Sequence, residues 1–167
     1  MKKTLLSIAF VASTLFAVAQ EKDVVDIAVG SKDHTTLVTA VKTAGLVETL
    51  KGKGPFTIFA PTNAAFDKLP AGTVGGLLKP DAKDALTGIL TYHVVAGNID
   101  AAAVIKAIKK GKGTATLTTL NGGTITARLD GAKVVITDKN GNKSVVVATD
   151  LKGSNGIVHV IDTVLLP

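Results

Sequence analysis

The sequence GSNGIVHVIDTVLLP, at residues 153–167, decides the fold of this chain of 167 residues. Its aliphatic side chains occupy both faces of an extended strand, with Val158, Val160 and Val164 on one face and Ile157, Ile161 and Leu165 on the other. A strand that is apolar on both faces is covered on both sides, as in the middle of a sheet. We therefore predict a central strand over residues 156–166, which follows a loop at residues 152–155.

The segment before this strand, residues 114–149, is typical of an antiparallel meander. Runs of β-branched residues alternate with three hairpin turn signals, namely Asn121-Gly122-Gly123, Asp130-Gly131 and Asn140-Gly141-Asn142. The predicted strands cover residues 114–120, 124–129, 133–138 and 144–149. A further strand at residues 56–60, between Pro55 and Pro61, must join this sheet from far away in the sequence.

The first half of the chain has helical periodicity. Apolar residues at helical spacing, bounded by capping residues and glycines, predict helices at residues 23–29, 35–44, 46–50 and 101–110, and one that opens at Pro80 and Asp81. Asp100 is the expected cap of the helix at residues 101–110, and Gly111 its stop signal. Helices in one half and a meander in the other predict an α+β domain of mixed topology.

The N-terminus is typical of a secretory signal peptide. Lys2 and Lys3 precede an uncharged apolar run at residues 5–19, which ends in the small-x-small pattern Ala17-Val18-Ala19. We expect cleavage after Ala19 and a single domain over residues 20–167. No apolar run reaches the roughly eighteen residues of a membrane span, so the predicted location is secreted, periplasmic or at the cell surface without a spanning segment.

Composition excludes several classes of function. The chain has no cysteine, which excludes thiol nucleophiles, zinc–thiolate sites, iron–sulfur clusters and disulfides. Removal of Lys2 and Lys3 leaves 17 basic against 13 acidic side chains, a net charge of +4. Because Arg128 is the single arginine and aromatic residues are scarce, nucleic acid is not an expected partner.

The basic residues gather in one place, after the helix expected at residues 101–110. This candidate surface consists of Lys106, Lys109, Lys110 and Lys112. Such a cluster could attract anionic glycans or acidic proteins at low salt. The simpler interpretation is a solvated helix end, where cations also suit the helix dipole.

Catalytic and metal-binding patterns are not found in the sequence, so we expect neither an enzyme nor a cofactor. The three histidines, His34, His93 and His159, are far apart in sequence, and no known catalytic motif is present. His159 and Asp162 are three residues apart in a predicted strand, so their side chains point to opposite faces and cannot pair. Asp162 and Asp150 are expected to accept backbone amides, and residues 138–142 to form a hairpin turn rather than a calcium loop.

The phenylalanines of the mature chain, Phe56, Phe59 and Phe66, all fall within one short segment. We expect them to pack in the core, on both sides of the strand at residues 56–60 and from the helix that follows it. The alternative is an aromatic cage for a ligand. Thr62 and Asn63 are expected to start that helix after Pro61 ends the strand.

Tyr92 and His93 lie where the Pro80 helix runs into an extended apolar stretch. An aromatic ring and an imidazole among aliphatic side chains can bury their rings while hydrogen-bonding nearby backbone groups. Packing is therefore the favoured interpretation, and recognition of a partner is the alternative.

Three of these segments resemble the signature blocks of the fasciclin (FAS1) domain family. They are GPFTIFAPTNAAF at residues 54–66, LTYHVV at 90–95 and GSNGIVHVIDTVLLP at 153–167, in the family's order and spacing. The third block contains Asn155, His159 and Asp162, which we add to the motif residues. The resemblance implies a wedge-shaped β-sandwich with N-terminal and flanking helices, in secreted or surface-attached proteins of cell adhesion.

The resemblance also implies a function. The leading hypothesis is a bacterial adhesion or interaction module that binds a cell-surface or matrix protein or a polysaccharide. In animal members of the family the Tyr-His motif is linked to receptor recognition.

The second hypothesis does not come from the resemblance. It is a carrier of a small apolar ligand, which would need a cavity of a few hundred cubic ångströms lined by residues such as Leu37, Val41 and Leu86.

Overall fold

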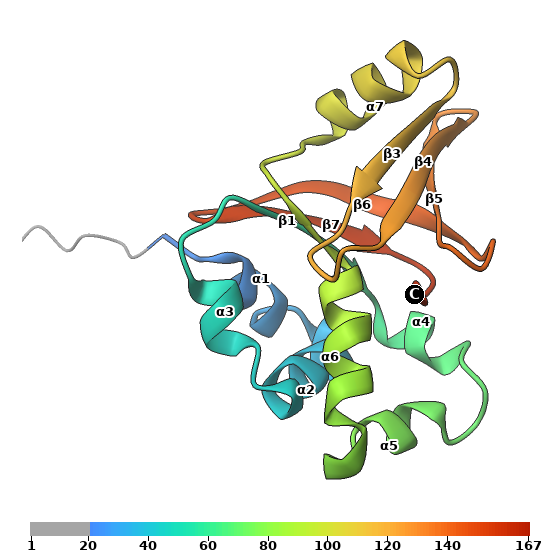
Figure 1. The fold of residues 1–167 in the computed structure, drawn as a ribbon. Coiled ribbons are helices and arrows are strands. Elements are labelled where there is room, and N and C mark those ends of the chain that lie inside the picture. The colour runs from blue at the N-terminus through green and yellow to red at the C-terminus, as the bar shows by residue number, and fades with distance from the viewer. Residues whose placement is uncertain (1–20) are drawn as a thin grey trace, which may run out of the picture.

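The strand β7, Gly156–Ile161, lies inside a seven-stranded sheet in the computed structural model, which describes residues 21–167 (Figure 1). All six of its residues are buried. It pairs in parallel with β1, Phe56–Pro61, and antiparallel with β6, Lys143–Gly153. The prediction of a central, doubly covered strand is confirmed. The proposed cleavage site after Ala19 lies outside the described residues.

The predicted end of this strand at residue 166 was wrong, because the chain bends directly after Ile161. The carboxylate of Asp162 accepts the backbone N–H of Val145 at 2.8 Å, and its own N–H donates to the carbonyl oxygen of Val145 at 3.1 Å. This exchange turns residues 162–167 away from the sheet. The apolar residues continue past the bend because Val164 and Leu165 are buried although they lie outside the strand.

The strands follow the order β2-β1-β7-β6-β5-β4-β3, and β1–β7 is the parallel pair. The remaining strands are β2 (Val94–Ala96), β3 (Thr114–Thr118), β4 (Thr124–Asp130) and β5 (Lys133–Thr137). The two outer strands meet: Val95 forms a bridge with Thr119, and the N–H of Leu120 donates to the carbonyl oxygen of Val94 at 2.7 Å. The sheet therefore nearly closes into a barrel.

The meander was predicted with boundaries correct to within two residues, except in β6. This strand runs to Gly153, four residues beyond the predicted end. Its pairing with β7 shifts register between Val146 and Ala148 and again between Ala148 and Leu151, and Asp150 has a φ of 59°. These irregularities interrupt the alternation of apolar and polar residues, which hid the second half of the strand from pattern analysis.

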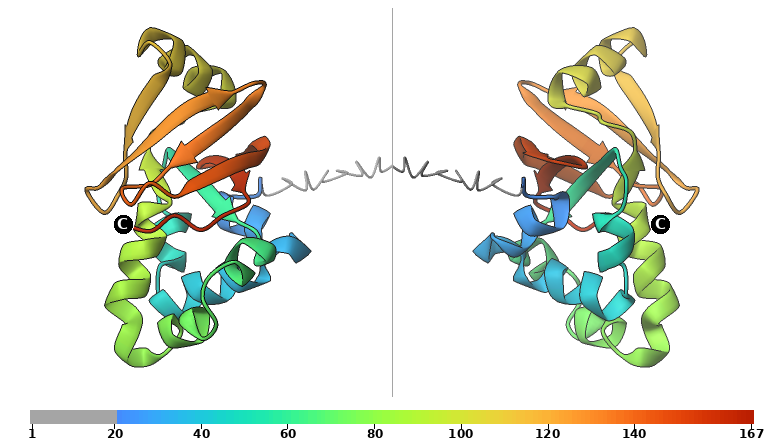
Figure 2. Two further views of the ribbon diagram at one scale, coloured as in Figure 1. Left: turned by 90° about the vertical axis from the view of Figure 1, so that its right-hand side faces the viewer. Right: turned by 90° about the vertical axis from the view of Figure 1, so that its left-hand side faces the viewer.

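The helices occupy two positions around the sheet. Six short helices lie below β1 and β7, and α7 covers the opposite side beside β3 and β4 (Figures 1 and 2). They are α1 (Val24–Val29), α2 (Thr35–Ala44), α3 (Val47–Lys51), α4 (Asn63–Asp67), α5 (Thr73–Leu77), α6 (Lys83–Tyr92) and α7 (Ala101–Lys110), with 3-10 turns at Lys32–His34 and Pro80–Ala82.

Each face of the central strands has its own core. Ile58, Ala60 and Val158 face the N-terminal helices, where they pack against residues such as Leu37 and Leu86. On the other face a second core fills the interior of the curved sheet under α7; it includes Phe59, Tyr92, Val104, Ile108, Ile125, Ile136, Ile161 and Leu165. The two cores together give the wedge of strands and helices that the side views show (Figure 2), and the α+β fold class is confirmed.

Candidate functional site

The three phenylalanines of the first block are divided between the two cores. Phe66 belongs to the core of the N-terminal helices, and Phe56 packs against its margin. Phe59, 1% exposed, lies in the core under α7. These rings therefore do not converge on a common cage.

Thr62 and Asn63 fasten two helices. The hydroxyl of Thr62 accepts the N–H of Ala65 at 3.2 Å and so caps α4. The side-chain oxygen of Asn63 accepts the N–H of Thr36 at 3.0 Å, in the first turn of α2. Because α2 has no side-chain cap from its own N-cap residue, Asn63 supplies that cap from another helix.

Tyr92 is the last residue of α6 and is fully buried. Its hydroxyl donates to the carbonyl oxygen of Thr124 at 2.7 Å and accepts the N–H of Lys139 at 3.0 Å. Burial raises the pKa of the phenol, which stays a donor. A Cβ at position 123 would lie only 2.8 Å from the ring. The hairpin of β3 and β4 can therefore pack against the ring because residue 123 is a glycine.

His93 is buried beside Tyr92, with both ring nitrogens in use. Nδ1 donates to the carbonyl oxygen of Ile89 at 2.8 Å, and Nε2 accepts the N–H of Leu165 at 3.0 Å. These two bonds require the neutral ring with its proton on Nδ1. Burial lowers the pKa of His93 to about 4, which agrees with that state. Both side chains of the Tyr-His pair therefore lie inside the domain.

His159 and Asp162 have separate partners. The ring of His159 stacks on Phe59 with centroids 5.6 Å apart, and its Nε2 donates to the carbonyl oxygen of Ile99 at 2.8 Å. Asp162 forms a 3.4 Å ion pair with Lys68. Partial burial disfavours its charged form, but the N–H of Val145, the hydroxyl of Thr163 and the Lys68 ammonium together hold the pKa of Asp162 below its usual value. No His–Asp couple is formed by these two residues.

The loop at residues 138–142 is a hairpin turn organised by Asp138. One carboxylate oxygen accepts the N–H groups of Asn140 and Asn142 at 2.9 and 2.8 Å. The other accepts the side-chain amide of Asn142 at 2.9 Å and the N–H of Leu166 at 3.0 Å. Four donors occupy this carboxylate, so it is directed at the protein rather than at a cation.

The lysines at the end of α7 are exposed. Lys106, Lys109 and Lys110 lie on the outer side of the helix, and Lys112 follows it with a φ of 56°. Within the described part of the chain, none of the ion pairs involves these four side chains. They form a cationic surface, which we call the lysine end of α7.

The apolar crevice expected for a carrier is smaller than predicted. A space of about 160 Å³ opens between the N-terminal helices and strands β1 and β7. Leu37 and Val41 line it as expected, but Leu86 does not. Sites for drug-sized ligands have volumes of roughly 300–1,000 Å³, so this crevice can hold only a small group. Leu86 packs in the core of the N-terminal helices without lining the crevice.

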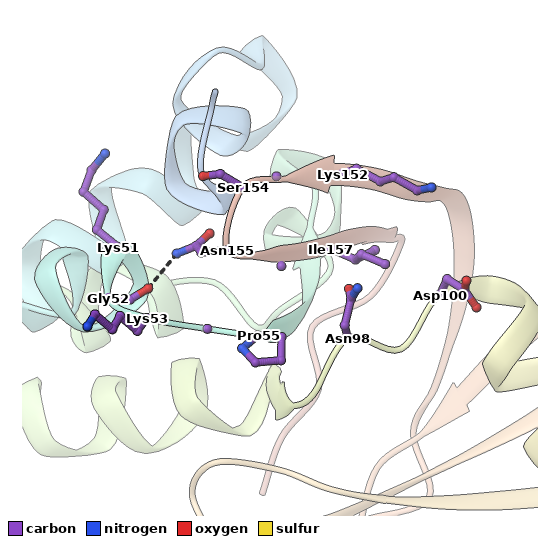
Figure 3. A pocket seen from close by; sticks show the side chains of 13 residues that line it. Lys51, Gly52, Lys53, Pro55, Asn98, Asp100, Lys152, Ser154, Asn155 and Ile157 are labelled. Atoms are coloured by element: carbon purple, nitrogen blue, oxygen red, sulfur yellow. Dashed lines mark hydrogen bonds between the residues drawn. The ribbon is translucent and has the colours of Figure 1, made fainter. Parts of the chain in front are cut away.

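A larger cleft, of about 660 Å³, lies at the other end of β1 and β7 (Figure 3). Three loops form it: the α3–β1 loop with Lys53 and Pro55, the β2–α7 loop with Asn98 and Asp100, and the β6–β7 turn with Lys152 and Ser154. We call it the hairpin cleft. From the sequence, Asn155 was selected as a motif residue and Asp100 as a helix cap. The other polar residues of the cleft, Lys53, Asn98, Lys152 and Ser154, were missed; the signal was lysine next to glycine in both Lys51–Gly54 and Lys152–Gly153.

Asn155 holds the walls of the hairpin cleft together. Its amide nitrogen donates to the carbonyl oxygen of Gly52 at 3.0 Å (Figure 3) and to that of Leu50 at 2.8 Å, and its oxygen accepts the N–H of Val24 at 3.1 Å. A Cβ at Gly54 would overlap the carbonyl oxygen of Asn155. The turn of the third block thus fixes the ends of α1 and α3 against β1.

The comparisons with known proteins agree on one family. A model of the fasciclin domain matches residues 32–167. Protein sll1483 of Synechocystis is 48% identical over 144 residues, which are 86% of this chain and 73% of that protein. The transforming growth factor-beta-induced protein ig-h3 of Sus scrofa is 37% identical over 153 residues, 86% of this chain and 19% of that protein. The cell surface glycolipoprotein MPB83 of Mycobacterium bovis is 43% identical over 122 residues, 73% of this chain and 48% of that protein.

A solved structure has the same fold. It is the FAS1 domain pair from the insect cell adhesion molecule Fasciclin I, with a TM-score of 0.59 and 22% sequence identity. The match covers 78% of this chain and 43% of that structure, so this chain spans less than half of the pair. Among the described residues, no helix has the length and apolar character needed to cross a membrane.

Proposed function

Because this chain belongs to the fasciclin domain family, we propose that it is a non-catalytic interaction module that binds a protein or a polysaccharide outside the cytoplasm. The family's presence in an insect cell adhesion molecule supports an interaction role. The signal-peptide pattern of residues 1–19 and the cell-surface relative MPB83 support a secreted, periplasmic or cell-surface location.

One observation carries this proposal: the aromatic and histidine side chains of the three sequence blocks are used for internal contacts. Tyr92, His93 and His159 are buried and hydrogen-bonded to backbone groups. Such residues build the scaffold, and the exposed loops and helix ends are left for a partner. Within the described residues, no group of three histidine, aspartate or glutamate side chains is placed to hold a metal ion, and we propose no reaction.

The lysine end of α7 is the first candidate contact surface. Its four cations are exposed and are not neutralised by acidic neighbours among the described residues. An anionic glycan or an acidic protein surface is the complementary partner. The carrier function is less well supported, because the apolar crevice has a volume of only about 160 Å³.

A pull-down from the native cell envelope tests this function. The captured protein and polysaccharide are identified for the wild type and for the triple variant Lys109→Glu, Lys110→Glu and Lys112→Glu. The matched control reverses three exposed lysines on the opposite, helical side, Lys42→Glu, Lys79→Glu and Lys83→Glu.

We expect the α7 variant to lose capture at low salt while its melting temperature stays within about 2 °C, because exposed charges contribute little to stability. Equal capture by both variants would exclude the lysine end as the contact surface. Capture of no envelope component by the wild type would contradict the interaction function itself.

A further inference from the structure

We propose that the hairpin cleft binds a segment of a linear acidic polysaccharide, whose sugars carry carboxylates. This inference rests on the proposed function, because it names a partner class and a second contact surface for it. The cleft is at the N-terminal end of α7, whereas the lysine end is at its C-terminal end, about 15 Å away for a helix of ten residues.

The shape of the hairpin cleft suits a chain-like ligand. Its volume of about 660 Å³ lies in the range of ligand-binding clefts. Three loops from different parts of the sequence form its walls, with Pro55 on one wall, Ser154 on the β6–β7 turn, and Asn98 between Pro55 and Asp100 (Figure 3). The cleft is open to solvent along these loops, so a long polymer can pass through without burying its ends.

The charges of the hairpin cleft favour carboxylates. Lys53 and Lys152 are exposed, and neither forms an ion pair among the described residues. The third lysine, Lys51, is already committed, because its ammonium lies 2.8 Å from both Asp23 and Asp26. The lining residues include no arginine, whose guanidinium would suit bidentate contact with a phosphate. The two flexible ammonium groups are better suited to separate, singly charged carboxylates.

The neutral groups of the cleft are those that recognise sugars. The side chains of Asn98 and Ser154 are exposed, and neither is hydrogen-bonded within the described chain. An amide and a hydroxyl can each donate and accept, as sugar hydroxyls require. The exposed ring of Pro55 offers an apolar surface for the C–H face of a sugar. Asp100 is the acidic residue of the lining, and its carboxylate is used to cap α7 through the N–H of Ala103 at 2.7 Å.

The cleft is rigid before a ligand arrives. Asn155 joins the β6–β7 turn to α1, to the end of α3 and to the α3–β1 loop, and the N–H of Gly97 in the β2–α7 loop donates to the carbonyl oxygen of Pro55 at 2.9 Å. Gly54 and Gly156 allow backbone approaches that any side chain would block, since a Cβ at Gly156 would overlap the carbonyl oxygen of Phe56. Because preformed loops lose little conformational entropy on binding, they favour the binding of a flexible polymer, which itself loses entropy.

A titration with tetragalacturonate, followed by NMR of the labelled domain, tests the inference. Its tetramethyl ester has the same sugar rings without the charges and is the ligand control. The test variant is Lys53→Gln with Lys152→Gln, and the matched control is Lys79→Gln with Lys83→Gln, which removes the same charge from exposed lysines on the helical side, outside both proposed contact surfaces.

We expect shift changes at Asn98, Lys152 and Ser154, and an affinity about tenfold lower for the methyl ester and for the Lys53/Lys152 variant. The Lys79/Lys83 control should stay within about twofold of the wild type. Equal losses in the two lysine variants, equal binding of the ester, or equally tight binding of hexaglutamate would overturn the assignment of an acidic sugar to this cleft.

Failure here is separable from failure of the proposed function. If the wild type captures envelope components but tetragalacturonate does not bind at millimolar concentration, the inference about the cleft is wrong and the interaction function stands. If tetragalacturonate binds in the cleft while no envelope component is captured, the cleft is supported and the envelope partner is not.

Discussion

The imidazole of His93 accepts the backbone N–H of Leu165 at 3.0 Å, although the two residues are 72 positions apart in the sequence. The same ring donates from Nδ1 to Ile89 at 2.8 Å. One side chain thus joins the end of α6 to the C-terminal segment, which leaves the sheet after Ile161. This relationship makes His93 a structural residue, whose removal should act on stability first.

We predict that His93→Ala lowers the free energy of unfolding by about 1–3 kcal/mol, because it removes buried packing and leaves the N–H of Leu165 without a partner. Urea unfolding of the wild type and variant measures this change. Binding of envelope material, assayed well below the melting temperature, should be retained. Unchanged stability with lost binding would instead identify His93 as a recognition residue.

The lowered pKa of His93 predicts a dependence of stability on pH. Burial holds the pKa at about 4, against 6.5 for an exposed histidine, so the unfolded chain takes up this proton more readily. The contribution is therefore fully present above about pH 6.5 and is lost as the pH falls from 6.5 toward 4, by on the order of 3 kcal/mol.

The matched control for this pH dependence is His93→Gln. His34, whose pKa is also lowered by burial, acts in the same direction and remains in both proteins. The difference between the two unfolding profiles isolates His93. It should shrink between pH 6.5 and pH 4, and parallel profiles would contradict the neutral, buried ring.

Tyr92→Phe removes a single hydroxyl that two backbone groups use. The carbonyl oxygen of Thr124 and the N–H of Lys139 would lose their partner in a buried place. We expect a loss of about 1–3 kcal/mol in the free energy of unfolding. Hydrogen exchange should be faster at Lys139 than in the wild type. A variant as stable as the wild type would show that water replaces the hydroxyl.

Two glycine substitutions should have opposite effects. Gly54→Ala places a Cβ on the carbonyl oxygen of Asn155, so β1 and the β6–β7 turn must separate, and we expect a loss of about 2–4 kcal/mol. Gly88→Ala lies within α6 with nothing within 4 Å of the new Cβ, and should stabilise by up to about 1 kcal/mol. Thermal melts of both variants decide the pair, and equal effects would refute the close contact at Gly54.

Local patterns predicted most of the elements. The helix Ala101–Lys110 begins after its cap Asp100 and ends at Gly111, and the helix Thr35–Ala44 ends at Gly45, as the sequence predicted. The helix α5, Thr73–Leu77, was missed because its sequence contains two adjacent glycines, which disfavour a helix on their own. The strand β2 was seen only as an extended stretch, because three residues carry too little alternation to define a strand.

The site depends on contacts that no local pattern encodes. The alternation of residues in β1 predicted that Phe59 is buried. Its stacking on His159 could not be predicted in this way, because it depends on how β1 pairs with β7, which lies 100 residues later in the sequence. The hairpin cleft combines three loops that are far apart in the sequence, and no local pattern shows that they meet. A pattern of glycines shows that two backbones come close, and it does not show which two.

The parallel pairing of β1 with β7 also governs when the domain can fold. Phe56 opposes Gly156, and Pro61 opposes Ile161, so the centre of the sheet forms only between early and late segments of the chain. During synthesis, β1 stays without this neighbour until about one hundred further residues have followed. Closing so long a loop is slow, because its entropy is lost before the contacts form. Until the segment that contains β7 has been made, the centre of the sheet cannot form, and β1 has to wait beside the N-terminal helices without its parallel neighbour.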